Sequence, residues 1–316
     1  MGLGIILKKI KQYDKIIIHG HIRPDGDCYG SQFGLKDIIV SSFPHKKVYV
    51  VGETSEYVSF VGEVDTIDDS EYYGALSIVV DTATKDRISD QRYSLGSEII
   101  KIDHHIPVDQ YGDIIWVDTD FPSCAQMIAY FYDKYQDELK LSEAGAIALY
   151  TGIVTDTGRF RFRGVDELTH RLAGMLVSHG AIPEEIDLQL SQDTLEGAKL
   201  KGYVLSNFER SKHGFIYFKM TRDIIKKYNI SDEDAAAMVS ILGGIEGHPV
   251  WALIIEYPKE IRIRLRSNGP VISDIANEFS GGGHAKAAGG RLNSWRELKK
   301  LIKLVDARII EWRQNK

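Results

Sequence analysis

The stretch Gly20-His21-Ile22-Arg23-Pro24-Asp25-Gly26-Asp27 comes just after the apolar run 16–18, which is typical of a buried strand. Proline and glycine interrupt that strand, so the backbone must turn within residues 20–27. Such a turn can bring His21, Asp25 and Asp27 to one point in space. Because an imidazole and converging carboxylates are ligands that divalent cations use, the stretch predicts a metal site at the end of a strand.

The composition limits the class of protein. A length of 316 residues favours about two domains, and the net charge of −6 argues against a surface for long duplex nucleic acid. We expect no membrane attachment, because no apolar run approaches the ~20 residues that a membrane span needs. The first residues carry their charges after the apolar part, unlike a signal peptide. Two cysteines are too few for a disulfide framework, so we expect a cytoplasmic protein with buried thiols.

The first half of the chain alternates short apolar runs with helical stretches. This alternation predicts an α/β fold whose mostly parallel sheet has helices on both faces. The serines at 123 and 142 can cap the helices that follow them. The expected strands cover 15–19, 47–51, 76–81, 98–103 and 114–118, and the expected helices cover 31–39, 123–135, 142–155 and 166–178.

Polar side chains gather where the expected strands end. His21, Asp81 and the sequence Asp103-His104-His105 each fall at or just past the carboxyl end of a strand. Open α/β sheets bind ligands in the crevice outside those ends. A single aspartate there is usually a turn former or a helix cap, but three strands that end in this way favour a functional site.

The candidate ligands are imidazoles and carboxylates without a thiolate, which suits manganese better than structural zinc. They are too numerous for one ion that keeps an open position. They fit two ions about 3.5–4 Å apart, the arrangement that clamps the attacking and leaving oxygens in phosphoryl displacement. The candidates are His21, Asp25, Asp27, Asp81, His104, His105 and Asp156.

These motifs resemble those of the DHH phosphoesterase superfamily, and the stretch GGGHAKAAGG at 281–290 resembles the signature of its DHH-associated (DHHA1) domain. Within the superfamily the chain is similar to the bacterial group of oligoribonucleases and 3′-phosphoadenosine-5′-phosphate (pAp) phosphatases. The resemblance implies a DHH catalytic domain over 1–185 and a smaller α/β substrate domain of the DHHA1 type over 209–316. A helical pattern at 186–208 predicts a linker between them.

The resemblance also implies a role for each site residue. One Mn²⁺ would be bound on each side of a bridging carboxylate, and two further residues would act on the phosphate or orient the ring that does so. In this assignment His21 and Asp25 bind the first ion, Asp27, His104 and Asp156 bind the second, Asp81 bridges them, His105 faces the phosphate as a hydrogen-bond donor or acid, and Asp103 orients the histidines.

The second half contains an alternating strand at 260–266 that pairs in a hairpin with 251–255. One face carries isoleucine and leucine, and the other carries Arg262, Arg264 and Arg266. Arg266 and the serine after it resemble the family's arginine–serine segment, so we expect this guanidinium to clamp a substrate phosphate. Arg262 and Arg264 are interpreted more simply as a solvated surface.

The glycine run cannot be a nucleotide P-loop, since no lysine and serine or threonine follow at the required spacing. We expect Gly282, Gly283 and His284 to bind substrate through main-chain amides and the imidazole, and the alternative is a purely structural turn.

Cations and aromatic rings alternate at 159–163. The three arginines there, Arg159, Arg161 and Arg163, would contact phosphates and bases, or they would line an exposed amphipathic strand.

Taken with the resemblance, these features predict a manganese phosphohydrolase that degrades short RNA to mononucleotides and converts pAp to AMP. The alternatives are a phosphodiesterase of cyclic or linear dinucleotides (c-di-AMP or pApA) on the same fold, and a nucleotide sensor without catalysis. The resemblance also allows a homodimer.

Overall fold

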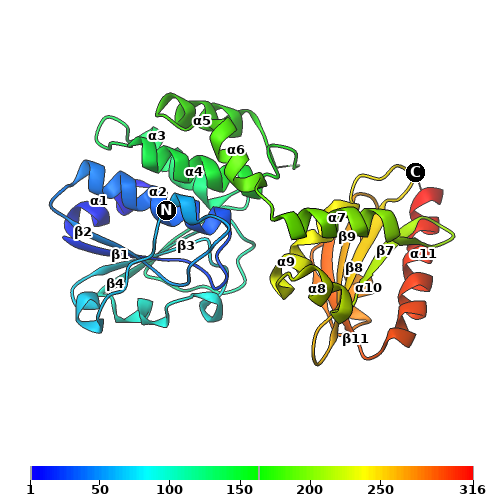
Figure 1. Cartoon of the computed structure of the whole chain (residues 1–316). Coiled ribbons are helices and arrows are strands. Elements are labelled where there is room, and N and C mark those ends of the chain that lie inside the picture. Colours follow the sequence, from blue (N-terminus) through cyan, green and yellow to red (C-terminus); the bar gives the residue numbers. More distant parts are fainter. Residues whose placement is uncertain (1, 163, 316) are drawn as a thin grey trace. The chain divides into compact units, whose positions relative to one another are not determined.

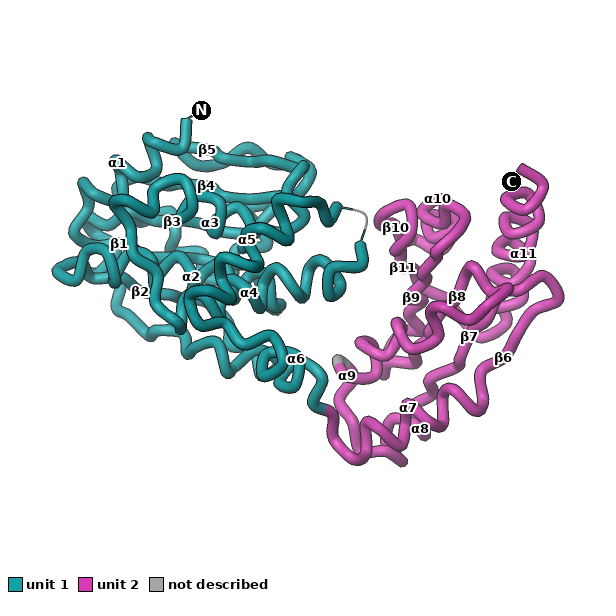
Figure 2. Tube along the Cα trace, turned by 90° about the horizontal axis from the view of Figure 1, so that it is seen from above, with its two compact units in different colours: residues 1–192 teal, residues 193–316 magenta. Residues whose placement is uncertain are grey.

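The chain forms two compact units, Met1–Gln192 and Asp193–Lys316, in a computed structural model that describes residues 2–162 and 164–315 (Figure 2). Arg163, one of the arginines with a predicted role, lies outside the described residues. Each unit has its own sheet and its own hydrophobic core.

The first unit contains a five-stranded sheet in which all neighbouring strands are parallel, in the order β2-β1-β3-β4-β5 (Figure 1). This confirms the predicted parallel sheet. The strands are β1 (Lys15–His19), β2 (Lys47–Val51), β3 (Leu76–Val80), β4 (Glu98–Asp103) and β5 (Ile114–Val117).

The strand order reverses at β1. The chain goes from β1 outward to β2 and then returns to β3 on the other side of β1. In open α/β sheets the connections on the two sides of such a point leave a crevice at the carboxyl ends of the strands. The carboxyl ends of β1 and β3, which precede His21 and Asp81, therefore lie next to each other at this crevice.

The two faces of the sheet are covered differently. One face packs against long helices in the main core of the unit. The other face packs against short 3₁₀ helices: Ile17 shares an apolar cluster with Tyr72 of η2 (Asp69–Tyr72), and Val79 shares another with Tyr93 of η4 (Gln91–Leu95). The long helices of the unit are α1 (Gly4–Gln12), α2 (Gly26–Ser42), α3 (Cys124–Lys134), α4 (Glu143–Asp156), α5 (Glu167–Ser178) and α6 (Pro183–Ser191).

Helices α2 and α4 cross closely because glycines line their contact. A Cβ atom added to Gly30 of α2 would lie 2.5 Å from the carbonyl oxygen of Ala148 and 2.8 Å from the backbone nitrogen of Gly152, both in α4. Only glycine permits such an approach of two backbones. The close crossing brings the start of α2 near the end of α4, where two of the predicted metal ligands lie.

Helix starts were predicted with mixed success. Ser123 caps α3 by accepting the N–H of Gln126, as predicted. The predicted cap at Ser142 was wrong: its hydroxyl donates to Asp37 and makes no cap hydrogen bond. The helix expected from residue 31 begins at Gly26 instead, because the residue before it, Asp25, already caps it.

The segment 186–208, expected to be a helical linker, is shared between the units. Helix α6 packs with α4 in the first unit, and α7 (Leu195–Asn207) packs with α8 in the second. Residues 192–194 between the two helices are not helical.

The second unit contains a mixed six-stranded sheet in the order β10-β11-β9-β8-β7-β6, in which β7 and β8 pair in parallel and the other neighbouring strands pair antiparallel. The predicted hairpin is confirmed as β8 and β9. Helices cover both faces. The strands are β6 (Glu209–Arg210), β7 (Phe215–Met220), β8 (Val250–Glu256), β9 (Ile261–Ser267), β10 (Gly282–Gly283) and β11 (Ala287–Leu292), and the helices besides α7 are α8 (Arg222–Tyr228), α9 (Asp232–Ala237), α10 (Ser273–Asn277) and α11 (Leu298–Gln314).

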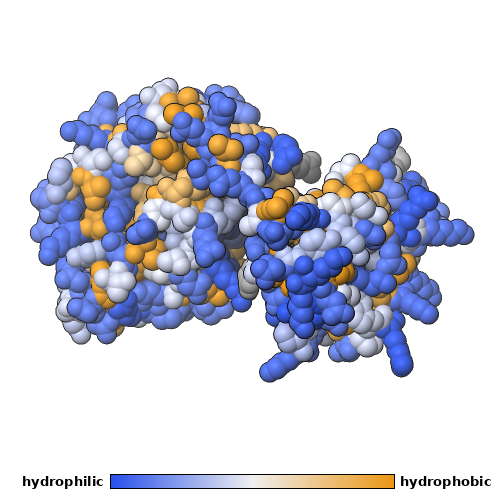
Figure 3. Space-filling view, viewed as in Figure 1, coloured by the Kyte–Doolittle hydropathy of each residue, from blue (hydrophilic) through white to orange (hydrophobic). Residues whose placement is uncertain are grey.

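The surface is mainly hydrophilic on the face drawn in Figure 3, where apolar residues are scattered among polar ones. Among the described residues, no helix combines the length and the apolar character needed to cross a bilayer.

Candidate metal centre and substrate groove

Asp81 lies at the centre of the candidate site. It is the first residue after β3, and its backbone adopts a left-handed conformation with φ 51°. This conformation is costly for a residue other than glycine, and such strain concentrates at functional sites. The side chain is almost fully buried, and its Oδ1 has no hydrogen-bond partner among the residues that the structure describes. A buried carboxylate oxygen without a donor is the kind of atom that a cation would satisfy.

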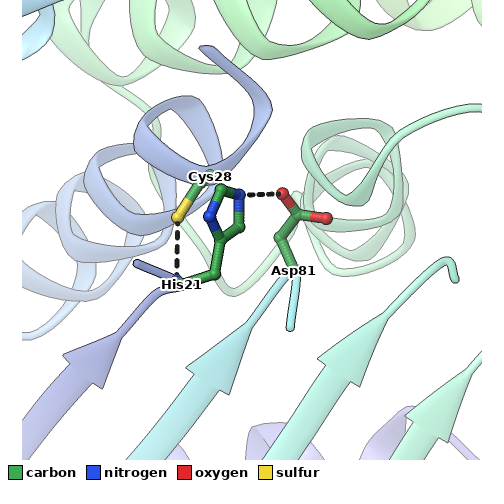
Figure 4. Close-up of side chains that lie close together, drawn as sticks. All are labelled: His21, Cys28 and Asp81. Carbon is green, nitrogen blue, oxygen red and sulfur yellow. Dashed lines mark hydrogen bonds and ion pairs between the residues drawn. The ribbon is translucent and has the colours of Figure 1, made fainter. Parts of the chain in front are cut away.

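His21 faces Asp81 from the end of β1 (Figure 4). Its Nδ1 lies 2.9 Å from the carbonyl oxygen of Ile22, which assigns the ring proton to Nδ1. Its Nε2 is then free to coordinate, and it lies 3.5 Å from Asp81 Oδ2 and 3.7 Å from Asp25 Oδ1. Burial alone would lower the pKa of His21, but the Asp25 and Asp81 carboxylates raise it well above its usual range.

His104 occupies the other side of Asp81 in the same manner. Its Nδ1 is 3.2 Å from the carbonyl oxygen of Phe121, which leaves Nε2 free to coordinate. This Nε2 lies 3.4 Å from Asp81 Oδ1, 3.4 Å from Asp156 Oδ2 and 3.5 Å from Asp27 Oδ2. Burial opposes protonation of the ring, but these carboxylates raise the pKa of His104 to about 10.

Asp27 is held by the start of α3. Its carboxylate accepts the backbone N–H of Cys124 at 2.7 Å and that of Ala125 at 2.8 Å. These are N–H groups that a helix start leaves without an intrahelical acceptor, and they favour a negative charge. Burial nevertheless raises the pKa of Asp27 far above its usual range, with Asp81 and Asp156 adding to the shift.

The third carboxylate of this group, Asp156, ends α4. Burial raises its pKa to about 6, Asp81 and Asp25 add to the shift, and His104 opposes it. Carboxylates buried side by side repel one another unless a cation neutralises them. The donor set and the unsatisfied Asp81 oxygen therefore fit metal binding, with separate groups of ligands on the two sides of Asp81.

Asp103 and His105 form a pair beside the carboxylates. Asp103 is fully buried, and its Oδ1 lies 2.8 Å from His105 Nδ1 and 3.2 Å from the backbone nitrogen of His105. His105 is more exposed, at 42% of its side chain. The hydrogen bond to Asp103 raises the pKa of His105, although burial opposes the shift. The pair presents a fixed imidazole at the rim of the site.

Cys28 lies nearer to the site than the sequence indicated. Its Sγ accepts the backbone N–H of His21 at 3.3 Å, and His21, Cys28 and Asp81 lie close together (Figure 4). Burial raises the pKa of the Cys28 thiol to about 11, so without a metal the thiol is protonated at neutral pH. Gly20 permits this packing, since a Cβ there would lie 2.3 Å from the sulfur. The sequence feature that could have placed Cys28 at the site is its position in the first helical turn after Asp25.

The predicted substrate residues come together in the second unit. Arg266 of β9 and the segment Gly282, Gly283 and His284 line one groove of about 580 Å³. Arg266 is half-buried, and its Nη1 donates to the carbonyl oxygen of Leu265. Burial lowers the pKa of Arg266, and the neighbouring positive charge of Arg264 adds to the shift. The site thus contains a guanidinium that is not neutralised by a carboxylate in any ion pair of the described residues.

Packing requires some of the glycines in this groove and not others. A Cβ at Gly281 would lie 1.9 Å from the carbonyl oxygen of Gly289, and one at Gly283, whose φ is +133°, would lie 2.6 Å from that of Ala287. Pairing of β10 with β11 therefore requires glycine at both positions. For these two residues this agrees with the alternative of a purely structural turn. A Cβ at Gly282 would meet nothing closer than 3.6 Å. Packing does not explain Gly282.

The other arginines are placed differently. Arg262 and Arg264 line the same groove as Arg266, but Arg262 is paired with Glu260 and lies 4.9 Å from the centre of the Tyr257 ring. The amphipathic strand considered for 159–163 is wrong. Gly158, Arg159 and Phe160 all have φ between 55° and 60°, so the described part of this segment is a left-handed turn.

Arg159 is tied to α6. Its guanidinium pairs with Asp187 and donates to Ser191 at 2.8 Å. Arg161 donates to the carbonyl oxygen of Gly158 at 2.8 Å. Arg159 is therefore engaged within the first unit.

Two family comparisons match this chain. The DHH family, N-terminal domain, matches residues 15–153, and the DHHA1 domain matches residues 213–311. The first match contains β1 to β5 and all but one of the predicted metal ligands. The second contains the groove with Arg266 and the glycine run.

Similar proteins extend over nearly the whole chain. A Bacillus subtilis protein named bifunctional oligoribonuclease and PAP phosphatase NrnA is 39% identical over 94% of this chain and 95% of its own length. A Streptococcus mutans protein named probable bifunctional oligoribonuclease and PAP phosphatase NrnA is 42% identical over 94% of this chain and 98% of its own length. A crystal structure of an exopolyphosphatase-related protein from Bacteroides fragilis has a TM-score of 0.87 at 23% identity and covers 97% of both chains, which shows that the fold is shared.

Proposed function

Because the chain belongs to the family of DHH phosphoesterases with a DHHA1 domain that includes the NrnA proteins, we propose that it hydrolyses short oligoribonucleotides to mononucleotides and converts pAp to AMP. The relatives at 39% and 42% identity carry names that describe these two activities. The observation that carries the proposal is Asp81, whose two oxygens face two separate groups of nitrogen and oxygen donors.

The donors suit two manganese ions. The group His21 and Asp25 would hold one ion, the group Asp27, His104 and Asp156 would hold the other, and Asp81 would belong to both. Imidazole and carboxylate without thiolate are the ligands that Mn²⁺ accepts. Two such ions, when bound, supply Lewis-acid activation of water and charge neutralisation at the phosphate.

The residues of the chain prepare this chemistry before any ligand arrives. The Nδ1 contacts of His21 and His104 with backbone carbonyls point both Nε2 atoms at the carboxylates. The start of α3 fixes the Asp27 carboxylate through two N–H groups. Asp103 accepts a hydrogen bond from the Nδ1–H of His105, so His105 Nε2 is available to a phosphate or leaving oxygen.

We assign a second phosphate to the groove of the second unit. Arg266 would bind phosphate oxygens with its planar fork, and Gly282, Gly283 and His284 would offer main-chain and imidazole donors. Few phosphates need neutralising in a substrate of two to five nucleotides, which is compatible with a chain of net charge −6. The two buried free cysteines suit a cytoplasmic protein. The homodimer stays a prediction that light scattering can test.

One substrate panel tests the proposal. The full chain is assayed with Mn²⁺ on pAp, on di- to pentaribonucleotides, on 24-mers and on cyclic dinucleotides. We expect AMP from pAp and mononucleotides from the short oligomers. A preference for 24-mers, or hydrolysis of cyclic dinucleotides alone, would contradict the proposal. Nucleotide binding without product release would instead indicate a sensor.

A further inference from the structure

A buried lysine, Lys101, lies beside Asp103 of the Asp103–His105 pair. Lys101 of β4 has only 1% of its side chain exposed, and its Nζ lies 3.3 Å from Asp103 Oδ2. Its Nζ also donates to the carbonyl oxygens of Ala83 at 2.9 Å and Asp109 at 3.3 Å. Burying an ammonium group costs several kcal/mol before its partners compensate. Neither the metal ligands nor the groove of the second unit accounts for this charge.

We propose that Lys101 is a positioning residue for His105, acting through Asp103. Residues 101 and 103 of one strand point to the same face of the sheet, so the ammonium and the carboxylate meet beneath the site. Asp103 Oδ2 faces Lys101, and Asp103 Oδ1 holds His105 Nδ1 at 2.8 Å. Asp103 Oδ2 has no hydrogen-bond partner among the described residues, so the charge of the Lys101 ammonium is what orients this carboxylate, and the carboxylate in turn orients the ring. This role rests on the proposed function, since it matters only if His105 acts on the phosphate.

The lysine also joins the segments that carry the site. Ala83 lies two residues after Asp81, and Asp109 lies four residues after His105. The Tyr111 ring covers the ammonium at 4.3 Å from its centre, and the Tyr111 hydroxyl donates to the carbonyl oxygen of Thr82 at 2.5 Å. One buried cation thus contacts the strand and both loops that shape the rim beside His105.

The chain provides a matched control in Lys46. Its side chain is equally buried, at 1% exposed, and its Nζ donates to the carbonyl oxygens of Lys11 at 3.0 Å and Tyr13 at 2.7 Å. The nearest carboxylate, Asp14 at 4.0 Å, is exposed and holds no histidine. Lys46 therefore shares the burial and carbonyl contacts of Lys101 without a link to the site.

The test compares Lys101→Met with Lys46→Met in the full chain loaded with Mn²⁺. We expect Lys101→Met to lower kcat for pApA about 10- to 100-fold, as loss of a residue that orients a site group does, with KM and the Mn²⁺ content unchanged. Lys46→Met should leave kcat unchanged. Equal kcat values for the two variants would overturn the proposal. Lys101→Gln keeps donors for the carbonyls but lacks the charge, and it decides the question in the same way if Lys101→Met does not fold.

A double-mutant cycle separates positioning from general damage. In a His105→Ala background, Lys101→Met should lower kcat by less than about twofold, because residues that act as one unit are not additive. A full additional loss would contradict the proposal. The ¹⁵N NMR signal of the His105 Nδ1–H group, recorded with Mg²⁺, should weaken in Lys101→Met and persist in Lys46→Met. An inactive wild-type chain would refute the proposed function, whereas an unchanged His105 signal in Lys101→Met would refute the role of Lys101.

Discussion

Oδ1 of Asp81 lies 3.4 Å from Nε2 of His104, and this buried oxygen has no hydrogen bond within the described part of the chain. The other oxygen of Asp81 lies 3.5 Å from Nε2 of His21. Both histidines use Nδ1 for a backbone carbonyl, so both Nε2 atoms are available to a cation. Asp81 is therefore the carboxylate through which two metal positions would be coupled.

The glycine contact between α2 and α4 should be required for stability. Gly30→Ala places a Cβ 2.5 Å from a backbone carbonyl oxygen, which the helices cannot avoid without moving apart. We expect a loss of about 1–3 kcal/mol, the usual cost of overpacking. The control is Gly174→Ala in α5, where a Cβ meets nothing within 4 Å, and this change should stabilise by up to about 1 kcal/mol. Thermal unfolding measures both, and equal melting temperatures would contradict the account of the crossing.

Binding of Mn²⁺ should release protons at pH 7. Without metal, the His104 ring has a pKa of about 10 and is protonated, whereas a ligand nitrogen must be neutral. The pKa of His21 is also raised, by the carboxylates of Asp25 and Asp81. Lowering the pH therefore favours the proton over the cation, and the affinity for Mn²⁺ should fall as the pH falls. Titration calorimetry in buffers of different ionisation enthalpy measures the release, and a binding enthalpy independent of the buffer would argue against these ligands.

Arg266 should control substrate affinity without changing metal binding. We expect Arg266→Gln to raise KM for short substrates about 10- to 100-fold, since a hydrogen bond to a charged group contributes about 1.5–3 kcal/mol. Arg262→Gln is the matched control, because Arg262 lines the same groove from the same face of β9 but its charge is already paired with Glu260. Steady-state kinetics on pApA compares the two. Equal KM values would show that Arg266 is not the phosphate clamp.

Much of the first unit could be predicted because its signals are local. Apolar runs of strand length gave all five strands, and the polar residues after them gave the positions that the structure brings together around Asp81. The start of α2 was missed because Asp25, chosen as a ligand, is also its cap. A carboxylate can do both, and spacing alone does not reveal it.

Other features depend on contacts between distant segments, which no local pattern contains. In the sequence Lys101 is a polar residue within an apolar strand pattern. Its contacts with the carbonyl oxygens of Ala83 and Asp109 arise only when the chain folds. The left-handed turn at Gly158–Phe160 begins a stretch, 159–163, in which arginines and aromatic rings alternate in sequence as they would in an amphipathic strand. The break between α6 and α7 likewise lies within a continuous helical pattern.

The most direct test of the central claim is the Mn²⁺ content of Asp81→Asn, measured by equilibrium dialysis and elemental analysis beside wild type and His21→Ala. Because Asp81 would belong to both metal positions, we expect about two ions per wild-type chain, about one in His21→Ala and loss of both in Asp81→Asn at the same free Mn²⁺ concentration. Circular dichroism confirms that each variant is folded. Retention of two tightly bound ions by Asp81→Asn would contradict the account.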